Sequence, residues 1–314
     1  MLRLAHLSRT DKLVVAILVG IPTLALLAFV WGPALASVLL SFTRWNGVGG
    51  LTMQACQPPP MPSVLNNGCW YGAQNYVQAA TIYPEFWPAV LHNVIWLLVF
   101  VGFATPLGMA FALIIDSGVK GSRFYQSALF MPVLLSLALI GIIWQFMYSS
   151  NYGLINSVLG RTSNSNLIDW LGNPNLNLWA VLVEASWRQA GYVMVLYLAG
   201  LKSVDPALKE AASLDGVNEW QRFRFVTFPV MRPINIVILI VTVIESLRAF
   251  DLVYITNRGH HGLELLSVLV TNNIVGEIQR IGFGSALGVV LLVIALVPIT
   301  FFLWQAFKRE GSFR

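Results

Sequence analysis

Long apolar stretches alternate with short polar segments along this chain of 314 residues. A helix needs about 20 mostly apolar residues to cross about 30 Å of hydrocarbon, because every backbone N–H and C=O must be hydrogen-bonded inside the helix there. Six stretches meet this requirement, and we expect each to form one membrane-spanning helix. They are Leu13–Leu40, Ala89–Ile115, Tyr125–Tyr148, Leu178–Leu201, Ile234–Tyr254 and Phe283–Phe307.

The composition agrees with an all-α membrane protein. Hydrophobic residues make up 57% of the chain, charged residues make up 11%, and the mean hydropathy is +0.70. Ordinary soluble domains are less apolar and more charged. The first apolar stretch is longer than the core of a cleavable signal peptide, so we expect a retained span. We therefore predict a cytoplasmic N-terminus, residues 1–12, and one transmembrane domain, residues 13–314, with an outer loop at 41–88 and a cytoplasmic loop at 202–229.

Lysine and arginine residues predict the orientation, because they are enriched on the cytoplasmic side of spanning helices. They gather in alternate segments, whereas the segments between these hold few cations. The clustered cations are Arg3, Arg9, Lys12, Lys120, Arg123, Lys202, Lys209, Arg222, Arg224, Lys308, Arg309 and Arg314. This alternation predicts six crossings with both termini in the cytoplasm. The net charge of +5 is thereby explained by topology and gives no indication of nucleic-acid binding.

The two cysteines of the chain, Cys56 and Cys69, both lie in the predicted outer loop. An extracytoplasmic site is oxidising, and two cysteines allow only one pairing within the chain. We therefore predict a disulfide that closes this loop. The alternative is two unpaired thiols.

A polar segment between the fourth and fifth predicted spans carries helix signals. Asp205 is a good N-cap and Pro206 suits the first helical position, so a short helix should begin there and end near Gly216. A second short helix should follow over residues 218–225, before Pro229. One face of the first helix carries small side chains and consists of Leu208, Ala211, Ala212 and Asp215. Small side chains let another surface approach closely, although an amphipathic connector on the membrane surface would have the same pattern.

The order Glu210-Ala211-Ala212, three residues, Gly216, nine residues and Val226-Thr227-Phe228-Pro229 resembles the cytoplasmic motif of the membrane subunits of binding-protein-dependent ABC importers. Most of the chain after about residue 70 is similar to the carbohydrate class of this family. The matching segments are Tyr71–Tyr76, Leu91–Val94, Gly108–Leu113, Phe130–Pro132, Trp187–Gly191, Tyr197–Leu201 and Phe250–Thr256. The resemblance ends at Asn257–Gly262, where the family often has Gly-Gly-Pro, so we expect an outer turn with its own shape or contacts.

The resemblance implies a type I permease subunit of an ATP-driven importer in a bacterial or archaeal cell membrane, with a sugar or related polyol as cargo. Its partners would be a second homologous permease chain, two ATP-binding cassette subunits, an external solute-binding protein and membrane lipid. ATP and magnesium would bind to the partner ATPase and not to this chain. The short helix would be the coupling helix, and its ATPase-docking residues would be Glu210, Ala211, Ala212, Leu214, Asp215 and Gly216.

Charged residues inside the predicted spans are candidates for a translocation path or gate. A charge near a helix centre costs roughly 2.5–3.5 kcal/mol, so it should face a partner or water. Glu184 and Arg188 can pair along one face of the fourth span, and Glu245, Arg248 and Asp251 recur at three-residue intervals in the fifth. Structural ion pairs explain these residues equally well. The aromatic and amide candidates are Trp144, Gln145 and Tyr148, although aromatic rings also gather at membrane interfaces.

The chain lacks the usual motifs of an enzyme. There is no Gly-x4-Gly-Lys-Ser/Thr phosphate loop, no His-Glu-x2-His metal pair and no Gly-x-Ser-x-Gly nucleophile motif. We therefore expect no catalytic residue. His260, His261 and Glu264 are not expected to hold a metal, because adjacent histidines in a glycine-flanked turn are more often solvated. An ion-coupled secondary transporter that uses the intramembrane acids is the alternative function, although no internal repeat supports it.

Overall fold

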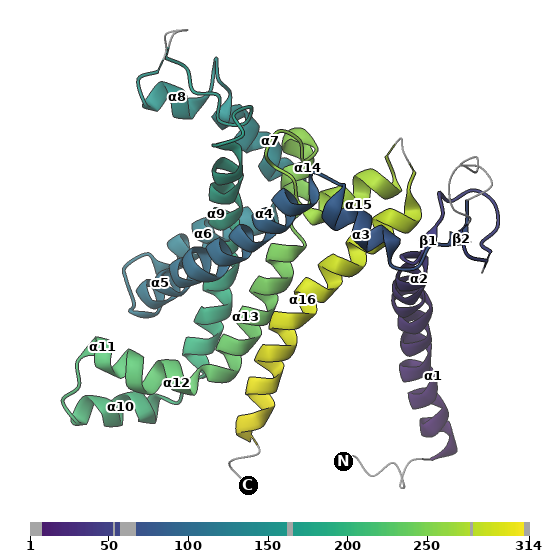
Figure 1. Cartoon of the computed structure of the whole chain (residues 1–314). Coiled ribbons are helices and arrows are strands. Elements are labelled where there is room, and N and C mark those ends of the chain that lie inside the picture. Colours follow the sequence, from purple (N-terminus) through teal and green to yellow (C-terminus); the bar gives the residue numbers. More distant parts are fainter. Residues whose placement is uncertain (1–7, 53, 57–66, 162–165, 277–278, 311–314) are drawn as a thin grey trace. The chain divides into compact units, whose positions relative to one another are not determined.

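The computed structural model describes residues 8–52, 54–56, 67–161, 166–276 and 279–310, and it is mainly helical (Figure 1). The chain divides into two compact units, Met1–Ile82 with Val270–Val289 and Tyr83–Leu269 with Val290–Arg314. Helix α16 (Ile281–Glu310) contributes residues to both units.

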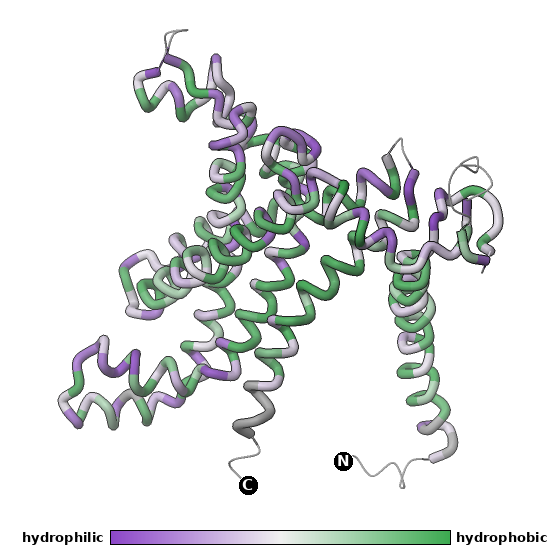
Figure 2. Tube along the Cα trace, in the orientation of Figure 1, coloured by the Kyte–Doolittle hydropathy of each residue, from purple (hydrophilic) through white to green (hydrophobic). Residues whose placement is uncertain are grey.

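A long apolar helix begins the first unit. It consists of α1 (Arg9–Leu26), the π-helical turn η2 (Leu27–Trp31) and α2 (Gly32–Leu40). Ser8 caps its start, because the hydroxyl oxygen accepts a hydrogen bond from the backbone N–H of Asp11. Figure 2 shows this helix mostly in the green of hydrophobic residues, with paler segments between them. Its side chains are almost all exposed within the isolated chain, as expected for a helix that meets lipid or another subunit.

A short two-stranded sheet follows this helix in the first unit. Strand β1 (Thr43–Arg44) pairs antiparallel with β2 (Cys69–Trp70), and α3 (Gln74–Thr81) comes next. The buried side chain of Asn75 donates from Nδ2 to the carbonyls of Ser41, at 2.8 Å, and Thr43, at 2.9 Å. These bonds satisfy backbone acceptors where α2 ends, so one asparagine fixes the exit of the helix.

The second unit is built around α9 (Asn177–Ser203), most of whose residues are buried. Helix α4 (Phe86–Val99), the π-helical turn η3 (Phe100–Ala104) and α5 (Thr105–Asp116) form a nearly continuous neighbour of α9. Gly108 permits this close packing, because a Cβ there would lie 2.7 Å from the carbonyl oxygen of Ala190. The core has one cluster around Trp96, Leu182 and Leu265 and another around Val193, Met194 and Ile238.

Two of the predicted spans are broken. The third consists of α6 (Ser122–Leu134) and α7 (Leu137–Tyr148), which meet at 101°. Leu135 is extended there, and the Ser136 hydroxyl accepts from the N–H of Leu139 to cap α7. The fifth consists of α13 (Arg232–Leu247) and α14 (Asp251–Asn257), with a break at residues 248–250. Continuous helices over Tyr125–Tyr148 and Ile234–Tyr254 were therefore wrong predictions, because apolar runs do not reveal where a helix changes direction.

Each π-helical turn in the described chain precedes a proline. The third of these turns, η4 (Phe223–Thr227), leads into α12 (Phe228–Val230). Proline lacks an N–H group, and its ring collides with the carbonyl four residues earlier in a regular α-helix. For Pro33, Pro106 and Pro229 that carbonyl lies at the middle of the wider turn, which relieves the collision.

By length and apolar composition, three helices of the described residues could each cross a membrane: Leu13–Leu40, Phe86–Asp116 and Ile281–Trp304. The bent pair α6 and α7 makes a fourth if it counts as one span. Helix α9 is long enough, with 27 residues, but it carries Glu184, Arg188 and Lys202 among its apolar side chains. Helix α13 has only 16 residues before its break. The structure therefore gives three or four clear spans where the sequence predicts six.

Candidate functional site

The polar segment after α9 forms a helical hairpin, made of α10 (Pro206–Leu214) and α11 (Glu219–Arg222) (Figure 1). The Asp205 carboxylate accepts from the N–H of Ala207 at 2.9 Å and caps α10, as the sequence predicts. Gly216 ends this helix with φ of +75°, a conformation that glycine adopts without steric cost. Asn218 and Gln221 then cap α11 reciprocally, through bonds of 2.8 and 3.0 Å. Both helices are therefore defined by local signals.

Most of the predicted docking residues are exposed on this hairpin. Glu210, Ala211, Asp215 and Gly216 are exposed, and Leu214 is 90% exposed. Ala212, in contrast, is buried, so the predicted small-residue face does not lie free as a whole. Ala212 faces the chain because α10 packs on α11 and η4. The free surface is thus an apolar tip at Leu214 beside an acidic and glycine-containing turn.

Four of the predicted intramembrane residues surround one pocket of about 200 Å³. Arg188 of α9 and Glu245 of α13 form an ion pair across the two helices, at 3.5 Å. Arg248 and Asp251 line the same pocket from the two sides of the break between α13 and α14. The break therefore lies at the pocket, and polar groups from both sides of it form part of the pocket wall.

Glu184 does not belong to this pocket. Its side chain is buried in the second unit, with 2% of the residue exposed. The pairing of Glu184 with Arg188 along one helix face was a wrong prediction, since Arg188 pairs with Glu245 on another helix. Sequence spacing identifies only neighbours within one helix, whereas this partner is brought close by the packing of α13 on α9.

Trp144, Gln145 and Tyr148 lie on α7 outside the pocket-lining residues. Gln145 donates from Nε2 to the carbonyl of Ile255 at 2.7 Å, and the Tyr148 hydroxyl donates to the carbonyl of Ala180 at 3.0 Å. The Trp144 ring lies 5.8 Å from the ring of Trp187 on α9. These contacts hold α7 against its neighbours and give the three residues a packing role.

Three aromatic residues also line the pocket: Trp96, Phe100 and Phe250. Trp96 is 1% exposed, and no acceptor for its indole N–H lies within the described part of the chain. A buried donor without an acceptor is costly, so Trp96 carries an energetic penalty in this arrangement of the helices. Trp96 and Phe100 stand in a uniformly apolar run, so the sequence offers no signal that could have identified them. Phe250 lies within the Phe250–Thr256 segment but was not recognised as a pocket residue.

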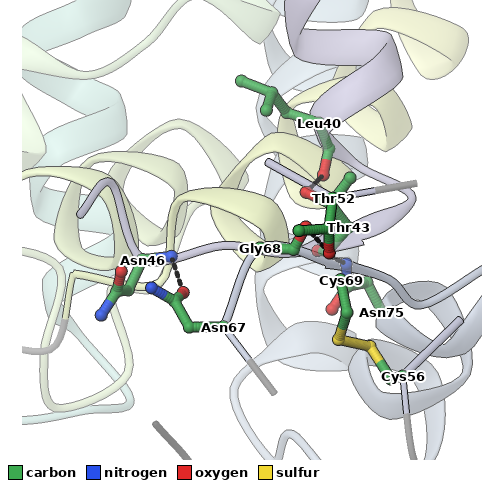
Figure 3. Close-up of a disulfide and its surroundings, with 9 residues drawn as sticks. All are labelled: Leu40, Thr43, Asn46, Thr52, Cys56, Asn67, Gly68, Cys69 and Asn75. Atoms are coloured by element: carbon green, nitrogen blue, oxygen red, sulfur yellow. Dashed lines mark hydrogen bonds between the residues drawn. A yellow bond between two sulfur atoms is a disulfide. The ribbon is translucent and has the colours of Figure 1, made fainter. Parts of the chain in front are cut away.

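The predicted outer loop contains a disulfide between Cys56 and Cys69, whose Cα atoms are 5.1 Å apart (Figure 3). Hydrogen bonds surround it: the N–H of Gly68 donates to the carbonyl of Arg44 at 2.7 Å, and the N–H of Asn46 donates to the Asn67 side chain at 3.1 Å. Part of the loop, residues 57–66, lies outside the described residues. The disulfide ties β2, at Cys69, to the segment around Cys56 that lies between the two strands in the sequence.

His260, His261 and Glu264 do not converge on one point. Glu264 accepts from the N–H of Gly262 at 3.0 Å through Oε1, and its Oε2 lies 3.8 Å from Nδ1 of His92. No group of three side chains of metal-binding type is gathered among the described residues.

Comparisons with known proteins find one family along nearly the whole chain. The model of the "Binding-protein-dependent transport system inner membrane component" family matches residues 13–310. The trehalose/maltose transport system permease protein MalF of Thermococcus litoralis is 31% identical over 76% of this chain and 81% of its own length. A bacterial ABC transporter that imports the acidic polysaccharide alginate has a chain of similar fold, with a TM-score of 0.77, 20% identity and coverage of 96% of both chains. A second structure of the alginate transporter, bound to a periplasmic protein carrying an alginate pentasaccharide, gives a TM-score of 0.75, with 20% identity and coverage of 94% of this chain and 93% of that one.

Proposed function

Because this chain belongs to the family of binding-protein-dependent transport system inner membrane components, we propose that it is a permease subunit of an ATP-driven ABC importer for a sugar or related polyol. The observation that carries the proposal is the capped α10–α11 hairpin, which presents the Glu210 to Gly216 motif at the end of α9. Family membership favours ATP-driven import over the ion-coupled alternative. The cargo class rests on relatives such as the trehalose/maltose permease.

The proposed topology has six crossings and both termini in the cytoplasm. Two further crossings, beyond the clear spans, would be α9 and the broken helix α13–α14. Their charged residues can be tolerated because they face the pocket or the protein interior. Helix α9 is about 40 Å long, which matches the thickness of a bilayer including its headgroups. The α10–α11 hairpin is attached to its C-terminal end, and the segment that contains residues 166–176 is attached to its N-terminal end. The cations that flank the hairpin support its cytoplasmic placement.

The hairpin would dock into a separate ATPase subunit through Glu210, Ala211, Leu214, Asp215 and Gly216. Docking of an exposed leucine would remove apolar surface from water, and the open turn at Gly216 would leave room for the ATPase. Ala212 would then act indirectly by holding α10 against the rest of the hairpin. ATP and magnesium would bind to the ATPase.

The pocket formed by Arg188, Glu245, Arg248 and Asp251 would be part of the translocation path. Its volume of about 200 Å³ is below that of a drug-sized ligand site and suits one small polar solute or a few waters. The charged groups can hydrogen-bond hydroxyl groups, and Phe100 and Phe250 offer flat faces. The cavity and its polar lining together support the proposal that this region is part of a translocation path and not of a tightly packed hydrophobic core.

The complete importer would contain a second homologous permease, two ATP-binding cassette subunits and an external solute-binding protein. The family description names the dependence on a binding protein, and the related alginate transporter has been solved with one. Membrane lipid would surround the spans.

The function is tested by reconstituting this chain with its ATPase, partner permease and binding protein in proteoliposomes. We expect uptake of a labelled sugar only with ATP inside and the loaded binding protein outside. The control omits the ATPase subunits. Uptake by this chain alone, driven by an ion gradient, would contradict the proposal.

A further inference from the structure

The segment that departs from the family pattern, residues 257–264, forms a turn with an unusual backbone. Arg258, Gly259, His261 and Gly262 have φ of 57°, 73°, 55° and 89°. Arg258 and His261 are two of the three residues other than glycine that have such angles in the described chain. Side chains make this conformation unfavourable, so it persists only where neighbouring contacts enforce it. Contacts with neighbouring residues therefore hold the 257–264 turn in place.

Two helices that neighbour this turn donate hydrogen bonds to it. Asn177, the buried first residue of α9, donates from Nδ2 to the carbonyl of His261 at 2.7 Å. His92 of α4 donates from Nδ1 to the carbonyl of Glu264 at 2.9 Å. Both bonds end on backbone carbonyls, so they fix the position of the turn whatever side chains it carries. Within the turn, Asn257 donates to the carbonyl of His260 at 2.6 Å.

The turn also packs tightly against the entry to α9. A Cβ built on Gly262 would lie 2.9 Å from Cβ of Pro174, and one on Gly259 would lie 2.6 Å from the Val268 side chain. Glycine at both positions allows the left-handed backbone and the close approach together. The turn is thus seated between the start of α9 and the start of α15 (Leu266–Ile274).

The turn is connected to the pocket by one short helix. Helix α14 has seven residues, and Asp251 and Leu252 at its start line the pocket. The turn follows directly at its other end. A movement of the turn away from α9 would therefore displace the side of the pocket that α14 forms.

We propose that Asn177 and His92 are positioning residues that clasp the 257–264 turn over the outer end of the transport path, and that this clasp opens during solute entry. The inference rests on the proposed function, which puts the start of α9 on the outer side of the membrane. The left-handed residues make the closed turn dependent on the clasp, so release of Asn177 and His92 frees it.

Cross-linkers of different length test whether the turn must move. Two double variants, Asn177→Cys with His261→Cys and His92→Cys with Glu264→Cys, are made in the complete importer. The native cysteines are joined to each other and leave no competing free thiol in this chain. A short bismaleimide should slow uptake at least about tenfold, because opening steps commonly limit turnover. A long, flexible bismaleimide should restore much of the rate. Mass spectrometry verifies each link.

A merely structural contact would not produce this dependence on linker length. Unchanged uptake with the short linker overturns the clasp. Equal loss with both linkers, or the same loss in single-cysteine variants treated with the reagent, also overturns it. If one double variant does not assemble, the other tests the same movement. Uptake by the unmodified complex is measured in parallel, so its absence would count against the proposed function and not against the clasp alone.

Discussion

Arg188 and Glu245 meet at 3.5 Å at the edge of the pocket, with 22% and 30% of their side chains exposed. Each helix alone would carry an unpaired charge through an apolar segment, which is costly. The pair compensates both charges where α9 and α13 meet. Because both groups are partly exposed to solvent, pairing stabilises them less than Coulomb attraction would stabilise a fully buried ion pair. A change in the spacing of the two helices can therefore separate them. A pair of this kind can stabilise one arrangement of the helices without preventing another.

Reversal of one charge in this pair should impair transport, and reversal of both should restore it. Glu245→Arg leaves two guanidinium groups facing each other, which should cost on the order of 1–3 kcal/mol. About 1.4 kcal/mol corresponds to a factor of ten, so we expect uptake to fall about tenfold or more. The double variant Arg188→Glu with Glu245→Arg should recover a large part of the rate.

Arg161→Glu is the matched control, because Arg161 is exposed and lies outside the pocket lining. It should leave uptake almost unchanged. A double variant that is no better than the single one would show that this pair does not act as a unit.

The α10–α11 hairpin is an element whose form is determined locally and whose proposed use depends on a partner. Its caps at Asp205 and Asn218 and its stop at Gly216 are all encoded within residues 205–221. The hairpin buries little of its own apolar surface, and its Leu214 tip is almost fully exposed. Because the hairpin has no sizeable hydrophobic core of its own, the local hydrogen bonds at its caps stabilise its two helices.

A bulky substitution at Gly216 should weaken binding of the ATPase subunit without preventing this chain from folding. No atom would lie within 4 Å of a Cβ at this position, so a larger side chain fits sterically in the free chain. Gly216→Arg adds bulk and charge to the proposed docking surface, together with left-handed strain of roughly 1–2 kcal/mol. We expect the variant to insert normally but to lose most of the co-purified ATPase and most uptake.

Gly216→Asn separates these two effects, because asparagine tolerates the left-handed conformation and remains small and uncharged. It should retain much of the ATPase. If Gly216→Arg retained the ATPase at the level of the unsubstituted chain, the docking surface would lie elsewhere.

Within the second unit, α9 connects the segment that contains α8 (Leu154–Val158) to the α10–α11 hairpin. Its first residue follows that segment, and its last residues lead to the hairpin. In the segment around α8, Asn156 donates to the carbonyls of Ser150 and Ile168 and accepts from the indole N–H of Trp170. Both ends of α9 are therefore attached to ordered polar structure, as expected for a helix that ends in water on two sides.

Thiol labelling should distinguish the two ends in intact cells. Tyr152 is 91% exposed next to α8, and Gly216 is exposed on the hairpin. With a membrane-impermeant maleimide, Tyr152→Cys should react in intact cells, whereas Gly216→Cys should react only after permeabilisation. The unsubstituted chain, whose cysteines are paired, is the control. Labelling of both positions from outside would contradict the proposed topology.

Local sequence signals predicted the structure well where local bonds determine it. Asp205, Pro206 and Gly216 mark the ends of α10, and the family resemblance agrees with the match over residues 13–310. The breaks before Ser136 and after Leu247 were missed, because apolar composition continues through both. The ion pair of Arg188 and the position of Trp96 at the pocket depend on how helices far apart in the sequence pack together. The spacing of residues along one helix does not contain that information.

The π-helical turn η3 also resets the phase of the helix that contains it. Buried positions before it fall at Phe86, Ala89, Asn93 and Trp96, those within it at Phe100 and Ala104, and those after it at Thr105, Gly108, Ala112 and Ile115. Steps of three and four drift slowly around a straight α-helix, by about 20° every seven residues, and the two adjacent buried residues Ala104 and Thr105 shift the buried stripe by one position at the end of the wide turn. The buried stripe stays in line because the turn holds one additional residue. A relative without the proline would have no reason to keep that residue, so a one-residue gap in an alignment at this place reflects helix phase and not the loss of a functional group.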